Sequence, residues 1–257
     1  MSIETIAQKL RNSAASATAI PPIRSHLPEL DVEVAYKIQS VNTKVALEAG
    51  REIVGYKIGL TSAAVQRQLG VDQPDYGVLF ADMQIGDAGE IDITGLISPR
   101  IEAEVAFVLG SAIENEDFSR DELVAAIDFA VPALEIADSR IKDWDINIVD
   151  TVADNASSGR FVLGSERRLL SEIDLELCGM VLERNGEAVA HGCGAACMGN
   201  PLNAAEWLVR TMLRQGLPVA AGNIILSGAL GPMVSFDARC AYRARIGGLG
   251  EVAAQAG

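Results

Sequence analysis

The pattern of apolar and polar residues is most informative between Arg100 and Leu109, where apolar residues alternate around two glutamates. Successive side chains of a strand point to opposite faces. One face would carry Ile101, Ala103, Val105, Phe107 and Leu109, and the other would carry Glu102, Glu104, Ala106 and Val108. The second face begins with two carboxylates and continues with apolar residues, which is not typical of a solvated face. The pattern therefore predicts a strand that brings two glutamates into the interior.

Two buried carboxylates on one strand face need a proton or a cation between them. Their Cα atoms should lie about 6.6–6.8 Å apart. At roughly 6 Å, two ionised carboxylates repel by about 2–3 kcal/mol at an effective dielectric constant of about 20. A cation explains the pattern better than a proton. The alternative is that Glu102 and Glu104 lie on an exposed edge strand, and the pattern alone leaves it open.

A third carboxylate could come from residues 132–137, which are typical of a short strand with Glu135 among apolar neighbours. Three carboxylates leave half of an octahedral shell open for water or substrate, which suits a hard ion such as Mg²⁺ or Mn²⁺. If Glu135 is instead an ordinary surface residue, the third ligand is missing.

Helical periodicity dominates the first fifty residues. Apolar residues recur with the spacing of one helical face at Ile3, Ile6, Ala7 and Leu10. Asp31 is placed to cap a second helix, which Gly50 would end. From Glu52 to Ile58 the period shortens to two, which predicts a strand. A short helix is expected over residues 62–69.

Capping and turn residues divide the rest of the chain. Ser119 and Glu122 form a capping box for a helix through about Ala130, and Asn200 followed by Pro201 begins another helix.

Asn185–Gly186 is the strongest hairpin signal in the chain. Residues 71–77 carry turn-forming residues throughout and are predicted as a loop. Residues 143–159 are polar and lack clear periodicity, which predicts a long active-site loop. Residues 223–227 and 241–246 are expected to be strands.

The predicted strands are not joined regularly by helices, which disfavours a doubly wound or barrel α/β fold. We expect an α+β protein with a mainly helical N-terminal region, residues 1–70, and a β-rich catalytic domain, residues 71–257. With 257 residues, 49% of them hydrophobic, the chain can bury one large core.

Charge and hydropathy exclude several classes of partner. The formal net charge of −14 argues against nucleic acid, because no basic patch is available to neutralise phosphates. No stretch approaches about 18 consecutive apolar residues, and the N-terminus does not resemble a signal peptide. We therefore expect a cytoplasmic protein with no membrane partner. An anionic substrate would require a cation or a local lysine to reverse the sign of the potential in the site.

The four cysteines do not suggest a disulfide framework, because cytoplasmic thiols are normally reduced. His191, Cys193 and Cys197 invite a zinc-site interpretation. Their spacing differs from that of common zinc sites, however, and no second pair completes a tetrahedron. With only two histidines, a His-based catalytic triad is poorly supported.

Lys57 and Asp75 are further candidates for chemistry. Lys57 lies in the predicted strand between Gly55 and Gly59, which permit close backbone approach. A lysine there could bind a carboxylate, donate a proton or form a Schiff base. Alternatively, Lys57 could lie on an edge strand, where its charge would only prevent pairing with a further strand. Asp75 could act as a base, although aspartates in Pro-Asp turns are usually structural.

Several runs of residues, spread over nearly the whole chain, match one known family. The chain resembles the hydratase/decarboxylase family of aromatic meta-cleavage pathways, which is related to fumarylacetoacetate hydrolase. The resemblance implies a mixed β-roll of the fumarylacetoacetate hydrolase C-terminal type and assembly into a homo-oligomer. The matching runs are residues 57–61, 65–75, 99–104, 132–135, 138–141, 150–157 and 226–233.

The resemblance also implies roles for individual residues. Glu102, Glu104 and Glu135 match the family's ligands for a divalent metal, for which Mg²⁺ or Mn²⁺ is expected. Lys57 and Asp75 match its proposed acid/base pair.

Ser157 and the backbone near Leu79 match positions that line the family's substrate pocket. Arg160 stands where an apolar residue is expected, and if it pointed into the pocket it would favour a substrate with a second carboxylate.

The implied activity is metal-dependent addition of water to a small 2-hydroxydienoate such as 2-hydroxypenta-2,4-dienoate, which gives 4-hydroxy-2-oxopentanoate. A 4-oxalocrotonate decarboxylase and a hydratase of a dicarboxylate analogue are alternatives on the same scaffold. A non-catalytic partner subunit agrees less well with the complete set of residues. A pathway enzyme that passes on the substrate is a further candidate partner.

Overall fold

The computed structural model describes residues 1–27, 31–62, 66–67, 71–217 and 219–257 of the chain. Most of the expected helix over residues 62–69, and the region boundary at residue 70, lie outside the described residues. The α-helices are α1 (Ile3–Ser16), α2 (Val32–Glu48), α4 (Arg120–Ala126), α5 (Ile148–Ala153) and α6 (Pro201–Arg214). The strands are β1 (Ile53–Gly59), β2 (Asp75–Phe80), β3 (Gln84–Ile85), β4 (Glu90–Ile91), β5 (Arg100–Leu109), β6 (Ile127–Ala137), β7 (Ser158–Leu163), β8 (Gly179–Arg184), β9 (Glu187–Cys193), β10 (Ile224–Ala229), β11 (Val234–Ser235), β12 (Ala241–Ile246) and β13 (Gly250–Ala256).

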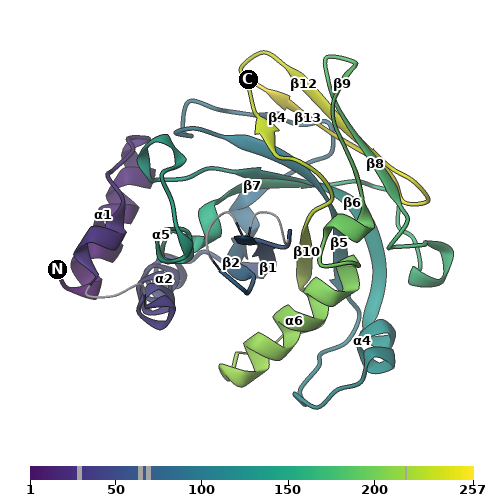
Figure 1. Ribbon diagram of the computed structural model, residues 1–257, viewed down its shortest axis with the longest axis horizontal. Helices are drawn as coiled ribbons and strands as arrows, with labels where there is room; N and C mark the ends of the chain where they lie inside the picture. Colours follow the sequence, from purple (N-terminus) through teal and green to yellow (C-terminus); the bar gives the residue numbers. More distant parts are fainter. Residues whose placement is uncertain (28–30, 63–65, 68–70, 218) are drawn as a thin grey trace.

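Most strands form one mixed sheet in the order β2–β1–β10–β5–β6–β7–β3, with β11 paired to the start of β5. β1 runs parallel to β10, and β3 runs parallel to β7. The other pairs in this sheet are antiparallel. Figure 1 shows the sheet bending around the centre of the molecule. The longest pairing, between β5 and β6, places Glu102 directly opposite Glu135.

A second, five-stranded sheet has the order β4–β13–β12–β8–β9 and packs on the large sheet through β12 and β13. Its hairpin between β8 and β9 turns at Asn185 and Gly186, which have φ values of 53° and 84°. Positive φ at both central residues is typical of a tight turn that matches the twist of the strands. The hairpin prediction is confirmed.

The N-terminal helices pack beside the large sheet, at the left of Figure 1, rather than over its centre. Asp31 caps α2 by accepting hydrogen bonds from the backbone N–H groups of Glu33 and Val34, as predicted. Buried apolar residues of α1, α2 and α5 form a hydrophobic cluster separate from the main core. The helical region therefore depends on a segment about 100 residues further along the chain, so the division at residue 70 stays a prediction.

The prediction of one long loop over residues 143–159 is wrong. This segment contains α5 and two 3-10 helices, η3 (Lys142–Trp144) and η4 (Asn155–Ser157). Asn147 caps α5 by accepting hydrogen bonds from Val149 N and Asp150 N. A helix of six residues has fewer than two turns, so its apolar face is too short to show a period in the sequence.

Two other boundaries differ from the sequence-based expectation. The Ser119 and Glu122 capping box is present, but α4 ends at Ala126 because β6 begins at Ile127 and pairs with β5 from there. Asp75 is the first residue of β2, not a loop residue. In both cases the pairing with a distant strand outweighs the local preference.

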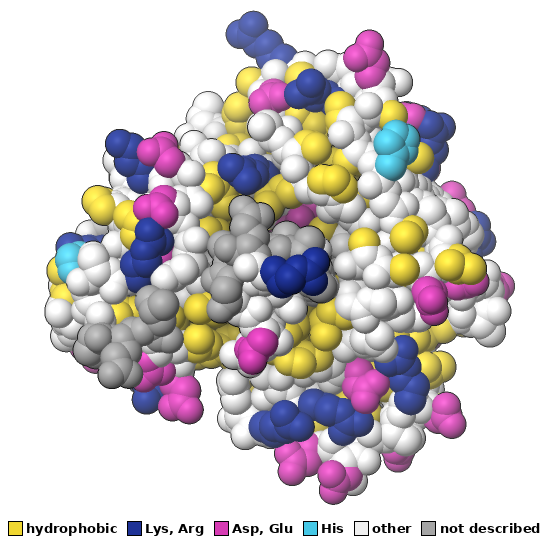
Figure 2. Space-filling model, viewed as in Figure 1, with side chains coloured by type: hydrophobic (Ala, Val, Ile, Leu, Met, Phe, Trp, Pro, Cys, Tyr) yellow, Lys and Arg dark blue, Asp and Glu magenta, His cyan; other side chains and the backbone are white. Residues whose placement is uncertain are grey.

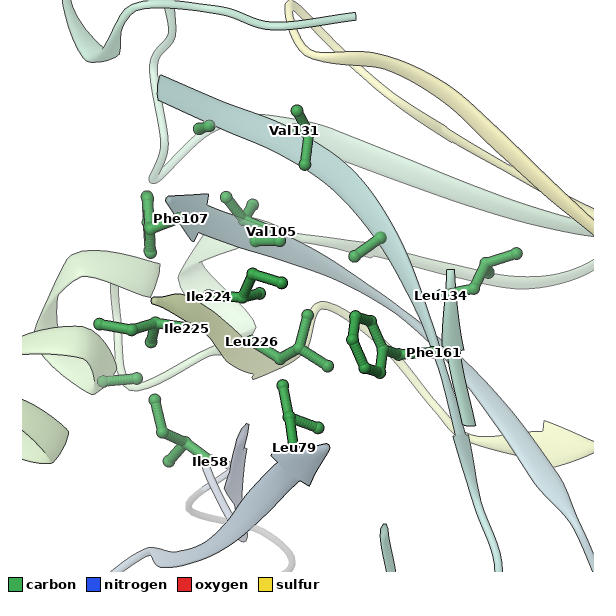
Figure 3. Packing of buried hydrophobic residues seen from close by; sticks show 14 of the residues in the cluster. Ile58, Leu79, Val105, Phe107, Val131, Leu134, Phe161, Ile224, Ile225 and Leu226 are labelled. Atoms are coloured by element: carbon green, nitrogen blue, oxygen red, sulfur yellow. The ribbon is translucent and has the colours of Figure 1, made fainter. Parts of the chain in front are cut away.

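The main core combines buried residues of both sheets with buried residues of α4 and α6. Figure 3 shows Leu79, Leu226 and Phe161 gathered there, and all three are almost fully buried. Figure 2 shows acidic and basic side chains interspersed on the visible face, with no continuous basic surface. Among the described residues, no helix is both long and apolar enough to span a bilayer.

Candidate metal centre and active site

Three glutamates from two neighbouring strands converge in the interior. Glu102 and Glu104 lie on one face of β5, and β6 places Glu135 opposite Glu102. Each carboxylate offers one oxygen atom, and these three atoms lie within 4.8 Å of one another. No other group of three or more potential metal ligands occurs in the part of the chain that the structure describes. The arrangement that period-two alternation predicted for Glu102 and Glu104 is present.

Several oxygen atoms of the buried carboxylates lack a hydrogen-bond donor among the described residues. Glu104 Oε1 and both oxygens of Glu135 are buried and accept no hydrogen bond from the described residues. Glu104 Oε2 accepts one from the backbone N–H of Gly228, at 2.7 Å. Buried charges are normally paired, protonated or bound to a metal. These unpartnered oxygens fit a hard divalent cation, because such ions prefer carboxylate ligands.

The electrostatics of the cluster agree with this interpretation. Burial and the neighbouring charge of Glu135 raise the pKa of Glu102 to about 8. The same causes, together with Glu102, raise the pKa of Glu104 well above its usual range. A carboxylate with a raised pKa holds its proton until a cation replaces it. Without a cation, the cluster therefore tends to keep protons near neutral pH.

Lys57 of β1 reaches the same cluster from across the sheet. Its Nζ atom lies 3.0 Å from Glu135 Oε1, and both side chains are buried. At this distance the two groups form a buried ion pair. Burial lowers the pKa of Lys57, but the charges of Glu135, Asp75 and Glu102 outweigh burial and raise it. Lys57 is therefore an ammonium group in this site. Because β1 lies between β2 and β10 in the large sheet, the edge-lysine alternative is wrong.

Asp75 lies next to Lys57 because β1 and β2 are paired. The register places Asp75 opposite Gly59, two residues beyond Lys57. A Cβ atom on Gly59 would collide with Asp75 Oδ1 and would lie 3.6 Å from Lys57 Nζ. Glycine is thus required for both groups to converge here. Burial raises the pKa of Asp75, and the Lys57 charge only partly offsets this effect.

One cavity of about 730 Å³ brings these groups together. Lys57, Asp75, Glu102 and Ser157 all belong to its wall. The Oγ atom of Ser157 is buried and makes no hydrogen bond to the described residues, so it is free to bind a ligand.

The wall near Ser157 is built from strained backbone. Asn155, Ala156 and Ser157 have φ values of 55°, 51° and 55°. Left-handed conformations cost non-glycine residues roughly 1–2 kcal/mol each. The side chain of Asn155 offsets part of this cost, because it accepts from Val78 N at 2.7 Å and donates to Val78 O at 2.9 Å. Such strain is common where a ligand must be positioned.

Some expected residues do not reach this cavity. The Leu79 side chain points into the core, and the residue is not part of the wall (Figure 3). Arg160 lines a different cavity, of about 370 Å³, behind the Asn155–Ser157 turn. It therefore cannot select a second carboxylate in the active site.

The zinc interpretation of His191, Cys193 and Cys197 has no support from the described residues. Cys197 is buried, and its thiol donates to the carbonyl oxygen of Ser227. These three residues form no ligand group.

Other wall residues were not identified from the sequence as part of the site. Arg100 lies two positions before Glu102, so the same alternation could have placed it on the glutamate face. Trp144 and Thr151 also line the cavity. They come from the segment that was predicted as a loop, so no period in the sequence indicated their direction.

A cluster of three glutamate carboxylates, with Lys57 and Asp75 beside it at a cavity whose wall includes Glu102, defines a candidate site for a cation-dependent enzyme. The model of the fumarylacetoacetate (FAA) hydrolase C-terminal family matches residues 55–256. The chain therefore belongs to the fumarylacetoacetate hydrolase family, as the sequence resemblance indicated.

Named relatives narrow the comparison. The chain is 52% identical to the 2-keto-4-pentenoate hydratase of Paraburkholderia xenovorans, over 97% of this chain and 93% of the relative. It is 39% identical to the 2-hydroxyhexa-2,4-dienoate hydratase of Comamonas testosteroni, over 98% and 97%. A solved structure of 4-oxalocrotonate decarboxylase from Pseudomonas putida G7, complexed with magnesium and adipate, is 34% identical. It covers 99% of this chain and 97% of its own, with a TM-score of 0.94.

Proposed function

We propose that this protein is a metal-dependent hydratase that adds water to 2-hydroxypenta-2,4-dienoate, the enol form of 2-keto-4-pentenoate, and gives 4-hydroxy-2-oxopentanoate. The observation that carries the proposal is the clustering of three glutamate carboxylates beside Lys57 and Asp75, at a cavity lined by Lys57, Asp75 and Glu102. Relatives with 52% and 39% identity over nearly the whole chain bear the names of hydratases of this substrate class.

Glu102, Glu104 and Glu135 would hold the divalent cation, for which we propose Mg²⁺ or Mn²⁺. The related decarboxylase was solved with magnesium, and oxygen-only ligand sets suit these ions. When bound, the cation supplies Lewis acidity at the C2 oxygen and stabilises the negative charge that develops there.

Lys57 and Asp75 would move the protons. Asp75 removes the proton of the C2 hydroxyl group, and the Lys57 ammonium group donates a proton to C5, which yields the conjugated 3-enone. The raised pKa of Asp75 makes it a stronger base than an exposed aspartate. Water oxygen then bonds to C4 while the Lys57 amine takes the water proton. Asp75 returns its proton to C3, which restores both groups.

Turnover of 2-hydroxypenta-2,4-dienoate tests the proposal directly. Loss of the dienoate is followed by ultraviolet absorbance, and the product is identified by NMR, with Mg²⁺, with Mn²⁺ and after chelation. We expect metal-dependent formation of 4-hydroxy-2-oxopentanoate. Lys57→Met should lower kcat by about 100-fold or more, since a positioned acid or base contributes that much. Lys37→Met, at an exposed position of α2, is the matched control.

A protein that binds Mg²⁺ but leaves the dienoate unchanged would contradict the proposal. The second candidate is decarboxylation of 4-oxalocrotonate, which the TM-score of 0.94 to the decarboxylase favours. Carbon dioxide release from that substrate by the same preparation separates the two functions. A protein that binds no metal at all would favour a non-catalytic subunit.

We propose three further properties that were predicted from the sequence. These are assembly into a homo-oligomer, association with a pathway enzyme and location in the cytoplasm. Sedimentation velocity of the purified protein tests the first of them.

A further inference from the structure

Arg100 is a cationic side chain on the cavity wall that takes no part in the proposed metal binding or proton transfer. Lys57 and Arg100 are the lysine and arginine side chains that line the cavity within the described part of the chain. Lys57 is engaged, because its Nζ atom lies 3.0 Å from Glu135 Oε1. Arg100 is half-buried and makes no side-chain hydrogen bond or ion pair to any described residue. Its guanidinium group is thus available to a ligand.

The structure holds Arg100 in place from several sides. Its backbone pairs with Ala137 of β6 on one side and with Ser235 of β11 on the other. Its guanidinium carbon lies 4.5 Å from the centre of the Trp144 ring. Trp144 is itself fixed, since its Nε1 donates to the carbonyl oxygen of Ser98 at 2.9 Å. Stacking on an aromatic ring orients a guanidinium group and leaves its N–H edge free.

The position of Arg100 relates it to the metal centre. Arg100, Glu102 and Glu104 alternate on one face of β5, with Cα atoms about 6.6–6.8 Å apart from one to the next. Arg100 is at the accessible end of this row, and Glu104 is fully buried at the other. A ligand entering the cavity would therefore meet Arg100 beside the carboxylates.

Charge balance requires such a group. With all groups ionised, the three glutamates and Asp75 outnumber the Lys57 charge, and a divalent cation still leaves the site negative. The substrate of the proposed function is itself an anion, so it would be repelled. A guanidinium group matches the planar carboxylate with two parallel hydrogen bonds.

We propose that Arg100, held against Trp144 at the start of β5, is a binding residue for the carboxylate of the substrate. The inference rests on the proposed function, because it assumes that the cavity takes a 2-oxo acid or its enol. It assigns Arg100 to binding and leaves proton transfer to Lys57 and Asp75.

The test compares two ligands of similar size and shape, one with a charged carboxylate and one with a neutral amide. Pyruvate is a small 2-oxo acid without the double bond that hydration needs, and pyruvamide is its neutral amide. Calorimetric titration of the Mg²⁺-loaded protein should show tighter binding of pyruvate. Arg100→Gln should weaken pyruvate binding by about 10- to 100-fold and change pyruvamide binding by about threefold or less, because a charge-assisted hydrogen bond is lost. Mn²⁺ affinity should stay unchanged.

Further variants make the test robust. Arg100→Lys should recover part of the pyruvate affinity, because it restores the charge without the two-pronged geometry. Arg214→Gln, at an exposed position of α6, should behave like the wild type. In turnover assays, Arg100→Gln should raise KM for the dienoate more than it lowers kcat.

Equal loss of pyruvate and pyruvamide binding, or no loss of either, would overturn the inference. The proposed function can fail separately. If the wild type does not hydrate the dienoate but still prefers pyruvate through Arg100, the carboxylate site stands and only the reaction is wrong.

Discussion

At the scale of single residues, the main feature of the site is the electrostatic repulsion between its carboxylates. The cluster of Glu102, Glu104 and Glu135 brings three acidic groups within 4.8 Å of one another. The charges are kept together by the Lys57 ammonium group and one backbone N–H, and by protons or a cation. Folding therefore brings like charges together, and their repulsion destabilises the folded state. A bound cation would reduce this repulsion. The same repulsion links metal binding to pH.

The stability of the metal-free protein should fall as the pH rises. Glu102 has a folded-state pKa of about 8, above its ordinary value. Such a group contributes stability that is fully present below its unfolded pKa and is lost as the pH rises through its folded pKa. From pH 6 to pH 9 we expect a loss of about 3 kcal/mol, the repulsion between two carboxylates roughly 6 Å apart at an effective dielectric of about 20.

Urea unfolding after chelation measures this dependence. Glu102→Gln should flatten the curve, and Glu114→Gln, at an exposed position, should reproduce the wild-type curve. A wild-type curve that rises between pH 6 and pH 9 would contradict the assignment.

At the scale of secondary-structure elements, strand pairing and one turn position the reactive groups. The register between β5 and β6 brings Glu135 to Glu102, and the register between β1 and β2 brings Asp75 to Lys57. The turn at Asn155–Ser157 adds the other wall of the cavity. Ala156 and Ser157 do not favour the left-handed conformation, so the contacts of Asn155 with β2 help to hold the turn.

Asn155→Ala should therefore affect both stability and activity. The change leaves Val78 N without the acceptor it has in the native protein, and it removes the two side-chain hydrogen bonds that join the turn to β2. We expect a loss of about 1–3 kcal/mol in the free energy of unfolding, the cost of an unsatisfied buried group. Because Ser157 lies in the same turn and lines the cavity, kcat should fall as well.

Urea unfolding and dienoate turnover check this prediction. Asn12→Ala, on the exposed face of α1, is the matched control and should change neither quantity appreciably. Unchanged turnover by a destabilised Asn155→Ala protein would show that the turn serves folding alone.

At the scale of the whole molecule, a bound cation would join parts of the chain that are distant in sequence. Its ligands come from β5 and β6, and the neighbouring Lys57 comes from β1. The net charge of −14 makes this local gain of positive charge favourable for an anionic substrate. The N-terminal helices contribute no residue to the metal cluster, and they pack instead with α5, whose residues precede the turn at Asn155.

Saturating Mg²⁺ should raise the thermal midpoint of the protein. A ligand at about 100 times its Kd stabilises the native state by roughly 2.7 kcal/mol, which for a chain of this size corresponds to a shift of about 5–10 °C. Differential scanning calorimetry with Mg²⁺ and with a chelator measures the shift. Glu104→Gln should abolish most of it, and Glu114→Gln should not. A shift that survives Glu104→Gln would place the cation elsewhere.

The sequence by itself determined the features that depend on local periods and caps. Alternation along residues 100–109 placed Glu102 and Glu104 on one buried face, and Asp31, Asn185–Gly186 and Asn200 marked their helix ends and hairpin correctly. The family resemblance added the joint assignment of Lys57 and Asp75. The periods and caps can be predicted from the sequence because each one depends on residues only a few positions apart.

Only the tertiary structure decided what depends on contacts between distant segments. It turned residues 148–153 into a helix, ended α4 at Ala126, and placed Asp75 in a strand. It also excluded Leu79 and Arg160 from the cavity and brought Arg100 and Trp144 to its wall. The physical reason is the same in each case. The direction of a side chain in a short or irregular segment is set by sheet register and packing, and neither is encoded in the neighbouring residues.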